Sequence, residues 1–403
     1  MRVLFVADGR SPIALNWITH LASAGLEVHL VTTFPCERIA GLASQVVVPV
    51  AFSGAARSST SAGGRQAGGA RAINLRAAIR HWAGPLTVPA GAAQLHELLL
   101  RVEPDLVHAM RVPYEGMLAA AADPSAPLLV SIWGNDFTLH APSSPLMRRW
   151  THKTLERADA LQTDCQRDLR LAREWGFRPE LPSLVVPGNG GIRPSVFHPG
   201  PGENARDSEV ASLLAAMDPG APVIVNPRGF RAYVRNDTFF QAAPEILKQQ
   251  PATVFLCPAM AGEREALAWV ERLGITDSVH FLSRLKPEDM AMVYQRAMIT
   301  LSISEHDGTP NTLLEAMACD CYPIAGDLDS IREWIDDGVN GRLVDPGDPS
   351  GLARAVLDSI RDVDSRSAAI RHNREMIARR ATQPAVMKEI QAFYAQIVSR
   401  GKK

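Results

Sequence analysis

The sequence lacks several features that would assign it to a specialised class of protein. Its 403 residues include five cysteines, and no two of them form a C-x-x-C pair, which argues against a disulfide framework and against a zinc site. No apolar run reaches the roughly 20 residues of a transmembrane helix, and the first residues lack the charged start and the cleavage site of a signal peptide. The formal net charge of -1 gives no overall attraction to nucleic acid. We therefore expect a cytoplasmic protein with reduced, mostly buried cysteines and no nucleic-acid partner.

The chain has the composition of an ordinary globular protein, with 46% hydrophobic and 21% charged residues. Short runs of Val, Leu and Ile alternate with helical patterns in two series. The predicted strands lie at 3–7, 27–33, 45–52, 105–110, 127–133, 158–163 and 183–188, and then at 222–227, 252–257, 278–283, 298–304, 321–326 and 341–346. Continuous apolar strands separated by helices are typical of parallel sheets covered on both faces. The fold class is therefore predicted to be α/β, with two doubly wound Rossmann-like domains facing across a cleft.

The length suits two domains that each bury a core. We predict an N-terminal domain at 1–198, a linker at 199–217, a C-terminal domain at 218–381 and a terminal helix at 382–403. In the terminal helix Val386, Ile390, Phe393 and Ile397 recur at helical spacing, so we expect it to pack back on the N-terminal domain. Gly190 and Gly191 are expected to supply backbone freedom at the junction.

One low-complexity stretch, residues 53–72, is dominated by Gly, Ala and Ser, and we expect it to be mobile. The weakly basic amphipathic pattern that follows at 73–86 has two interpretations. It predicts a helix that rests on anionic lipid at the inner face of a membrane or closes over an acceptor. The alternative is a surface helix packed on its own domain.

The segment DGTPNTLLEAMA at 307–318 follows a predicted strand and begins a helix. Open parallel sheets bind ligands at the carboxyl ends of their strands, and a helix N-terminus suits phosphate groups. Gly308 allows close approach of the backbone, and Pro310 is compatible with a first helical turn. Glu315 can accept hydrogen bonds from the two hydroxyls of a ribose, and Asp307 from those of an attached sugar. The alternative is that Asp307 only caps the helix and that Glu315 lies on a solvated face.

The longer segment SEHDGTPNTLLEAMACDCYPIAGDLDSIREWIDDGVNGRLVDPGD resembles the donor site of the retaining glycosyltransferases of family 4 (group 1), which have the two-Rossmann-domain GT-B fold. VHFLSRLKPEDMAMVYQRAMITLSIS, VVPGNGGIRPSVFHPG and ERADALQTDCQRDLRLAREWGF extend the resemblance over most of the chain. The family pattern places seven residues between two acids. Its first acid is Glu, whereas this chain has the shorter Asp307.

The resemblance implies an acceptor role for the N-terminal domain and a donor role for the C-terminal domain. In the donor domain it implies that Glu315 binds ribose and Asp307 the donor sugar. The turn of Gly308, Thr309 and Pro310 is expected near the phosphates, and Leu285 is expected to contact the base through its backbone.

The family neutralises the diphosphate with an Arg and a Lys after the first strand of this domain. In NPRGFRAYVRND, Arg228 matches the Arg and no Lys follows. Arg231 or Arg235 is expected to substitute, because guanidinium groups bind phosphate in bidentate fashion. The alternative is that these arginines pair with surface acids.

On the acceptor side the family often has His, Gly and Asp where this chain reads Trp133, Gly134 and a following Asp136. Trp133 donates but cannot accept a proton; it is either a stacking surface for the acceptor or a core residue. Asp136 either binds an acceptor hydroxyl or caps a helix. His108, at the end of a strand, is a further acceptor-side candidate with a structural alternative. Gly9 follows the first strand, where relatives have two glycines.

The implied reaction is retaining transfer of a sugar, hexosyl in type, from a nucleotide diphosphate sugar to a hydroxyl of a glycan, a lipid-linked molecule or a small molecule. Asp307, Arg228 and Arg235 are the catalytic candidates, since stabilising the departing diphosphate is expected to be the largest contribution. No cofactor and no metal are expected. Two alternatives remain: a nucleotide-sugar epimerase of the same fold, and a non-catalytic protein that binds sugar nucleotides or glycans.

Overall fold

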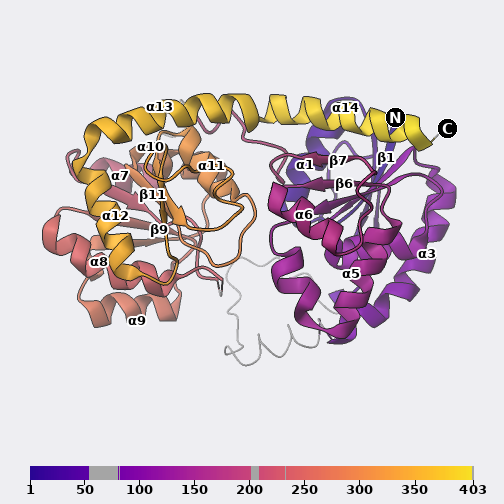
Figure 1. Cartoon of the computed structure of the whole chain (residues 1–403), viewed down its shortest axis with the longest axis horizontal. Helices are drawn as coiled ribbons and strands as arrows, with labels where there is room; N and C mark the ends of the chain where they lie inside the picture. Colours follow the sequence, from indigo (N-terminus) through magenta and orange to yellow (C-terminus); the bar gives the residue numbers. More distant parts are fainter. Residues whose placement is uncertain (54–79, 81, 201–207, 232, 402–403) are drawn as a thin grey trace. The chain divides into compact units, whose positions relative to one another are not determined.

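The computed structural model describes residues 1–53, 80, 82–200, 208–231 and 233–401. Within these residues the chain forms two compact units that divide between Gly190 and Gly191. The first unit combines residues 1–190 with the C-terminal segment from Val386, and the second spans Gly191–Ala385 (Figure 1). The predicted mobile stretch at 53–72, apart from Ser53, and most of the predicted basic helix at 73–86 lie outside the described residues.

The first unit is built on a parallel sheet in the order β3-β2-β1-β4-β5-β6-β7. Its strands are β1 (Arg2–Ala7), β2 (Glu27–Thr32), β3 (Ser44–Val47), β4 (Leu106–Met110), β5 (Leu128–Ile132), β6 (Ala160–Thr163) and β7 (Ser183–Val185). Its helices are α1 (Pro12–Ser23), α3 (Val88–Val102), α4 (Met117–Ala122), α5 (Pro145–Arg157), α6 (Gln166–Glu174) and α14 (Gln383–Gly401).

Successive side chains of β1 face opposite sides of this sheet, as strand geometry requires. Val3 and Phe5 pack with the core formed by α1 and α14, whereas Leu4 and Val6 pack with the core of α3, α4 and α5. Both faces are therefore covered, and the apolar runs of the sequence are explained by burial on two sides. The apolar stripe predicted for the terminal helix is buried in the first of these cores.

The second unit has a parallel sheet in the order β10-β9-β8-β11-β12-β13. Its strands are β8 (Val223–Val225), β9 (Val254–Pro258), β10 (Val279–Leu282), β11 (Ile299–Ser302), β12 (Tyr322–Gly326) and β13 (Arg342–Val344). Its helices are α7 (Glu209–Ala216), α8 (Asn236–Gln249), α9 (Arg264–Leu273), α10 (Pro287–Arg296), α11 (Asn311–Ala318), α12 (Pro349–Arg361) and α13 (Val363–Arg380). One core joins the sheet to α8, α9 and α12, and the other joins it to α10, α11 and α13.

The strand order determines where each unit can bind a ligand. In the first sheet the order reverses between β1 and β4, and in the second between β8 and β11. The loops at the carboxyl ends of two such strands diverge to opposite faces of the sheet and leave a crevice for ligands. The prediction of two doubly wound α/β domains is confirmed. Among the described residues, no helix is both long enough and apolar enough to cross a membrane.

Candidate functional site

An arginine and an aspartate meet at the strand reversal of the second unit. Arg228 follows β8 and Asp307 follows β11, and the Nη2 of Arg228 donates to Oδ2 of Asp307. Its Nη1 lies 3.4 Å from the Oγ1 of Thr312 on α11. The side chains of the pair are 8% and 14% exposed. The buried Nε of Arg228 has no hydrogen-bond partner among the described residues, so this guanidinium retains a donor for a ligand.

The turn after Asp307 is held rigidly beside the start of α11. The Oγ1 of Thr309 accepts a hydrogen bond of 3.0 Å from Nε1 of Trp334, and Ser330 donates to the backbone oxygen of Asp307 at 2.7 Å. The N-cap position of α11 is Pro310, and no side chain caps the helix. Asp307 is therefore not the helix cap that the alternative interpretation required. The N–H of Leu313 donates to the oxygen of Pro310 at 3.0 Å, and within the described part of the chain the N–H groups of Asn311 and Thr312 remain available to an anion.

Glu315 lies about one turn inside α11 and is partly buried. Burial raises the pKa of this carboxyl to about 7, while the charge of Arg193 acts in the opposite direction. No described group donates a hydrogen bond to it. The hydroxyl of Tyr294 on α10 is buried without a hydrogen-bond partner, and burial together with the charge of Glu315 raises its pKa well above the ordinary value. Among the described residues, the carboxyl of Glu315 and the hydroxyl of Tyr294 thus both retain unused hydrogen-bonding capacity.

Sequence reasoning missed Arg193 and Tyr294 in this region. Arg193 follows the glycine pair in GNGGIRP, and a cation next to a sharp turn was the signal that could have found it. Tyr294 lies in a helical pattern where a buried tyrosine is indistinguishable from core packing. Leu285 lies in the loop between β10 and α10, where its half-buried side chain packs against the core that contains Tyr294.

The two arginines proposed to replace the family lysine differ in their partners. Arg235 pairs with Asp237 at 2.8 Å and with Glu305 at 2.7 Å, and the hydrogen bond to Asp237 is the main reason that its pKa is raised. Arg231 is exposed and donates to the hydroxyl of Tyr233 at 2.9 Å. Arg235 therefore pairs with acids near the surface, as the alternative interpretation expected.

In the first unit, Asp136 links the loops that follow β4 and β5. Its Oδ1 accepts from Nε and Nη2 of Arg111 at 3.0 and 2.9 Å, and its Oδ2 accepts from the backbone N–H groups of Val112 and Trp133 at 3.2 Å each. The side chain is fully buried. Burial raises the pKa of Asp136, and Arg111 opposes this increase. Through these four hydrogen bonds Asp136 holds the loops after β4 and β5 together.

Trp133 remains a candidate for ligand contact. Its indole is half-buried, and the guanidinium carbon of Arg111 lies 5.5 Å from the ring centroid. The Nε1 is buried without a hydrogen-bond partner among the described residues. A donor in this position is normally satisfied by water or by a ligand.

His108 is not on the acceptor edge as predicted. It is fully buried in β4, where Nδ1 lies 2.6 Å from the hydroxyl of Tyr394 and Nε2 lies 2.8 Å from the Oγ of Ser131. Burial lowers its pKa to about 3, so the ring is neutral at physiological pH. The middle of β4 is covered by α14, and this tertiary contact places His108 in the core.

Gly9 follows β1 in a confined position. A Cβ on this residue would lie 2.5 Å from the Sγ of Cys36 and 2.9 Å from the Oγ1 of Thr32. Its N–H donates to the same Thr32 hydroxyl at 3.0 Å. Glycine is required here because the carboxyl ends of β1 and β2 approach closely.

Sequence reasoning also missed Glu115, which lies in the loop after β4. It is 4% exposed and accepts a hydrogen bond of 2.6 Å from the Oγ1 of Thr33, which follows β2. Burial raises its pKa to about 7, and the charge of Arg111 has a smaller opposing effect. An acid in the loop that follows a buried strand was the signal in the sequence.

Two family models match the chain. The model described as glycosyl transferase 4-like domain matches residues 9–189, and the model described as glycosyl transferases group 1 matches residues 221–362. The chain belongs to the group 1, or family 4, glycosyltransferases. The resemblance read from the donor motif is therefore confirmed at the level of the family.

Curated relatives of this glycosyltransferase-family chain include a D-inositol 3-phosphate glycosyltransferase of Corynebacterium kroppenstedtii, 26% identical over 64% of this chain and 58% of the relative. An N-acetyl-alpha-D-glucosaminyl L-malate synthase of Bacillus anthracis is 24% identical over 45% of this chain and 47% of the relative. The chain thus spans about half the length of these curated relatives.

Solved structures with the same fold cover nearly the whole chain. Anabaena HepE in complex with UDP aligns with a TM-score of 0.73 at 15% identity, covering 98% of this chain and all of that one. Sucrose-phosphate synthase from Thermosynechococcus elongatus gives a TM-score of 0.73 at 16% identity and covers 99% of each chain. At these identities the similarity shows the GT-B fold alone.

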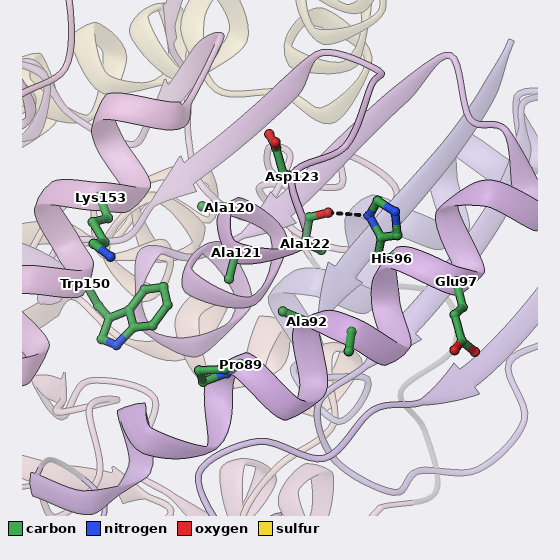
Figure 2. Close-up of a pocket in the computed structure, with 11 residues that line it drawn as sticks. Pro89, Ala92, His96, Glu97, Ala120, Ala121, Ala122, Asp123, Trp150 and Lys153 are labelled. Atoms are coloured by element: carbon green, nitrogen blue, oxygen red, sulfur yellow. Dashed lines mark hydrogen bonds between the residues drawn. The ribbon is translucent and has the colours of Figure 1, made fainter.

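A separate cavity of about 700 Å³ lies in the first unit, and none of the predicted site residues lines it. Figure 2 shows that Trp150 and Lys153 line it from α5 and that His96 and Glu97 line it from α3. The Nδ1 of His96 lies 2.9 Å from the backbone oxygen of Ala122, at the end of α4. Helices α3, α4 and α5 thus form its walls.

Among the described residues, one group has the spacing of a metal site: Asp164, Cys165 and Asp168 after β6. The guanidinium of Arg167 already pairs with Asp168 at 2.7 Å. Burial is the main cause that raises the pKa of Cys165 far above its ordinary value, so its thiol is protonated. A protonated thiol next to an acid paired with Arg is a poor set of ligands for a metal ion.

Proposed function

We propose that this chain transfers a sugar, hexosyl in type, from a nucleotide diphosphate sugar to an acceptor hydroxyl with retention at the anomeric carbon. The observation that carries the proposal is the arrangement at the β8–β11 reversal. There Arg228 and Asp307 meet beside the uncapped start of α11, with Glu315 one turn further along the same helix.

Each part of this arrangement suits one part of a nucleotide sugar. Arg228, through its Nε, and the N–H groups of Asn311 and Thr312 bind the diphosphate. Within the part of the chain that the structure describes, no group donates to the carboxyl of Glu315, which accepts from the two ribose hydroxyls. Asp307 accepts from hydroxyls of the donor sugar, and its bond to Arg228 holds the guanidinium in place before the donor arrives. Leu285 and the turn at 308–310 border the same ligand.

The rate increase is assigned mainly to electrostatic stabilisation of the diphosphate as it leaves. Arg228 supplies one cation, and Arg231 supplies the second in preference to Arg235, which already binds two carboxylates. In this scheme the leaving phosphate takes the proton of the acceptor hydroxyl, so no separate base is required. Cationic side chains and the helix N-terminus do the work without a metal or a cofactor.

The comparisons support the choice of donor. Anabaena HepE has been crystallised with UDP and with UDP-glucose, and the curated relatives are named as glycosyl-transferring enzymes. We therefore place a uridine diphosphate hexose first among the donors. We also propose that the reaction takes place in the cytoplasm.

The test combines calorimetry with an assay of transfer. UDP and UDP-glucose are titrated into the full chain and into Glu315→Gln, which keeps the shape of the side chain but removes its charge. Loss of charged hydrogen bonds to two hydroxyls is expected to weaken UDP binding by about 10- to 100-fold. The matched control is Glu265→Gln, an exposed residue of α9 that is expected to leave UDP affinity within about twofold.

Four results would contradict the proposal. Equal UDP affinity in Glu315→Gln and the wild type removes the ribose role. An epimerised sugar nucleotide formed without acceptor identifies the chain as an epimerase. Tight binding with neither hydrolysis nor transfer of UDP-glucose across acceptors identifies a non-catalytic binding protein. NMR of the transferred sugar reports its anomeric configuration, and inversion would refute retention.

A further inference from the structure

Trp334 connects the turn that borders the proposed donor site to the body of the second unit. Its indole Nε1 donates a hydrogen bond of 3.0 Å to the Oγ1 of Thr309, and the residue is 5% exposed. Thr309 directly precedes Pro310, the N-cap residue of α11. A buried indole N–H usually finds one acceptor. Here that acceptor is a hydroxyl of the turn, 25 residues earlier in the chain.

The backbone of Trp334 is supported by a buried pair of amides. The Nδ2 of Asn340 donates to the backbone oxygen of Trp334 at 2.9 Å and to the Oδ1 of Asn373 at 2.8 Å. Asn373, which lies on α13, donates to the backbone oxygen of Asn340 at 2.9 Å. The two asparagines are 1% and 0% exposed. Bonded polar networks in a core make a structure rigid, so the loop that carries the indole is fixed on α13.

A guanidinium group lies over one face of the same indole. The guanidinium carbon of Arg380, at the end of α13, is 4.4 Å from the ring centroid of Trp334. The Nη1 of Arg380 donates to the backbone oxygen of Glu333 at 3.2 Å, which attaches the cation to the same loop. A cation over an indole face stabilises the ring in that orientation. The direction of the indole N–H is therefore set by both the backbone and the cation.

The loop that carries Trp334 holds both ends of the turn at 307–310, which we call the donor turn. Ser330 donates to the backbone oxygen of Asp307 at 2.7 Å, and Trp334 donates to the hydroxyl of Thr309. The first N–H groups of α11, which we assign to the diphosphate, follow this turn directly. Donors stabilise a transition state best when their positions are fixed before the reaction.

We propose that Trp334 is a positioning residue for sugar transfer. Through Thr309 it holds the donor turn so that the first N–H groups of α11 face the departing diphosphate. The inference rests on the proposed function, since it adds a residue to the same donor site. Charge develops on the diphosphate in the transition state, so a loosened turn costs more there than in the bound donor. Loss of the indole N–H is therefore expected to lower kcat more than it weakens UDP binding.

Steady-state transfer, or hydrolysis, of UDP-glucose by the full chain tests this expectation. Trp334→Phe keeps an aromatic ring beside Arg380 and removes the N–H. It is expected to lower kcat about 10-fold, the loss of about one hydrogen bond, with UDP affinity by calorimetry within about threefold. Thr309→Val removes the acceptor of the same bond and is expected to lower kcat to a similar extent. The double variant is expected to lose no more than either single variant, because both changes remove one interaction.

Trp269 provides the matched control in the same unit. It also lies beside a cation, with the guanidinium carbon of Arg272 3.9 Å from its ring centroid, and it stacks on Phe240. It lies on α9 and makes no contact assigned to the donor. Trp269→Phe is therefore expected to leave kcat and UDP affinity unchanged. Arg380→Gln keeps the indole N–H of Trp334 and removes only the cation, so it is expected to lower kcat about two- to threefold.

NMR of the indole N–H groups separates positioning from core packing. The resonance of Trp334, assigned by its absence in Trp334→Phe, is expected to shift when UDP is added, because its acceptor hydroxyl belongs to the donor turn. Thr309→Val is expected to shift the same resonance without ligand. The resonance of Trp269 is expected to stay in place in both experiments.

Wild-type kcat in Trp334→Phe would overturn the inference, and so would losses that multiply in the double variant. An indole resonance of Trp334 that stays in place while UDP binds would also overturn it. If Trp334→Phe does not fold, Thr309→Val decides by the same kinetic criterion. A wild type that neither binds UDP nor turns over UDP-glucose contradicts the proposed function and, with it, this inference. An active wild type with an unaffected Trp334→Phe contradicts the inference alone.

Discussion

The two units place the same residue types at the same point of their sheets but use them differently. In the second unit the acid at the reversal, Asp307, is bonded to Arg228. In the first unit the acid at the reversal, Glu115, is bonded to a hydroxyl, and Arg111 pairs with Asp136 instead. An acid paired with a cation keeps its charge in a buried place, whereas an acid bonded to a hydroxyl changes its charge with its surroundings.

On the donor side the difference fits the proposed function. A diphosphate always arrives charged, so the donor side needs a cation that is positioned in advance. In the first unit the hydrogen bond from Thr33 and the charge of Arg111 only partly offset the burial that raises the pKa of Glu115. The two arginine–aspartate pairs therefore differ in function. In the Arg228–Asp307 pair, the Nε of Arg228 has no partner among the described residues and can bind a ligand. The Arg111–Asp136 pair joins two loops of the first unit.

The largest expected effect separates these two arginine–aspartate pairs. Arg228→Met is expected to lower kcat about 10²- to 10³-fold, because it removes a preorganised cation from the departing diphosphate. Asp307 is 14% exposed, so water can solvate the aspartate that remains. The measurement is steady-state transfer, or hydrolysis, of UDP-glucose together with urea unfolding.

Arg111→Met provides the contrast. It leaves the fully buried Asp136 without its cation, and this is expected to cost about 3–5 kcal/mol of unfolding free energy. If Arg228→Met instead lost stability and kept kcat, the comparison between an open pair and a structural pair would be wrong.

The second prediction concerns the two buried glutamates. Burial raises the pKa values of Glu115 and Glu315 to about 7 from an ordinary 4.5. Their protonated forms favour folding, so stability is full below about pH 4.5 and is lost as the pH rises to about 7. For Glu115 the loss is roughly 2–3 kcal/mol. The unfolding free energy of Glu115→Gln, measured with urea, is expected to decrease less between about pH 5 and about pH 8 than that of the wild type.

Glu315→Gln is expected to reduce the pH dependence of the unfolding free energy less than Glu115→Gln does. The reason is that Glu315 is partly exposed, so that solvent screens its charge. An equal dependence on pH in the wild type and both variants would show that neither acid is protonated in the folded chain. The exposed substitution Glu97→Gln serves as the control for added amide groups.

The sequence predicts the fold well because the fold depends on local patterns, and the donor-site residues, whose roles stay a prediction, are also placed by a local pattern. Buried parallel strands appear as continuous apolar runs, and Asp307 and Glu315 lie within one loop and one helix. His108 shows the limit: its partner Tyr394 is 286 residues away, and no local pattern reveals that a terminal helix covers its strand. Glu115 was missed for the same reason, since its partner Thr33 is 82 residues away.

The smallest expected effect tests which arginine is the second cation on the donor side. Arg235 is bonded to Asp237 and Glu305, so a phosphate must compete with two carboxylates for it. Arg231 is bonded to the neutral hydroxyl of Tyr233 and is available without that competition. Arg231→Gln is expected to weaken UDP binding roughly 3- to 10-fold, a typical loss for one exposed charged contact, whereas Arg235→Gln is expected to change it less than twofold. Titration of UDP at low and at high salt checks the assignment, because screening reduces the contribution of an exposed cation. A larger loss for Arg235→Gln would mean that the donor displaces its carboxylates, and the second unit would then resemble the first in rearranging its charges around a ligand.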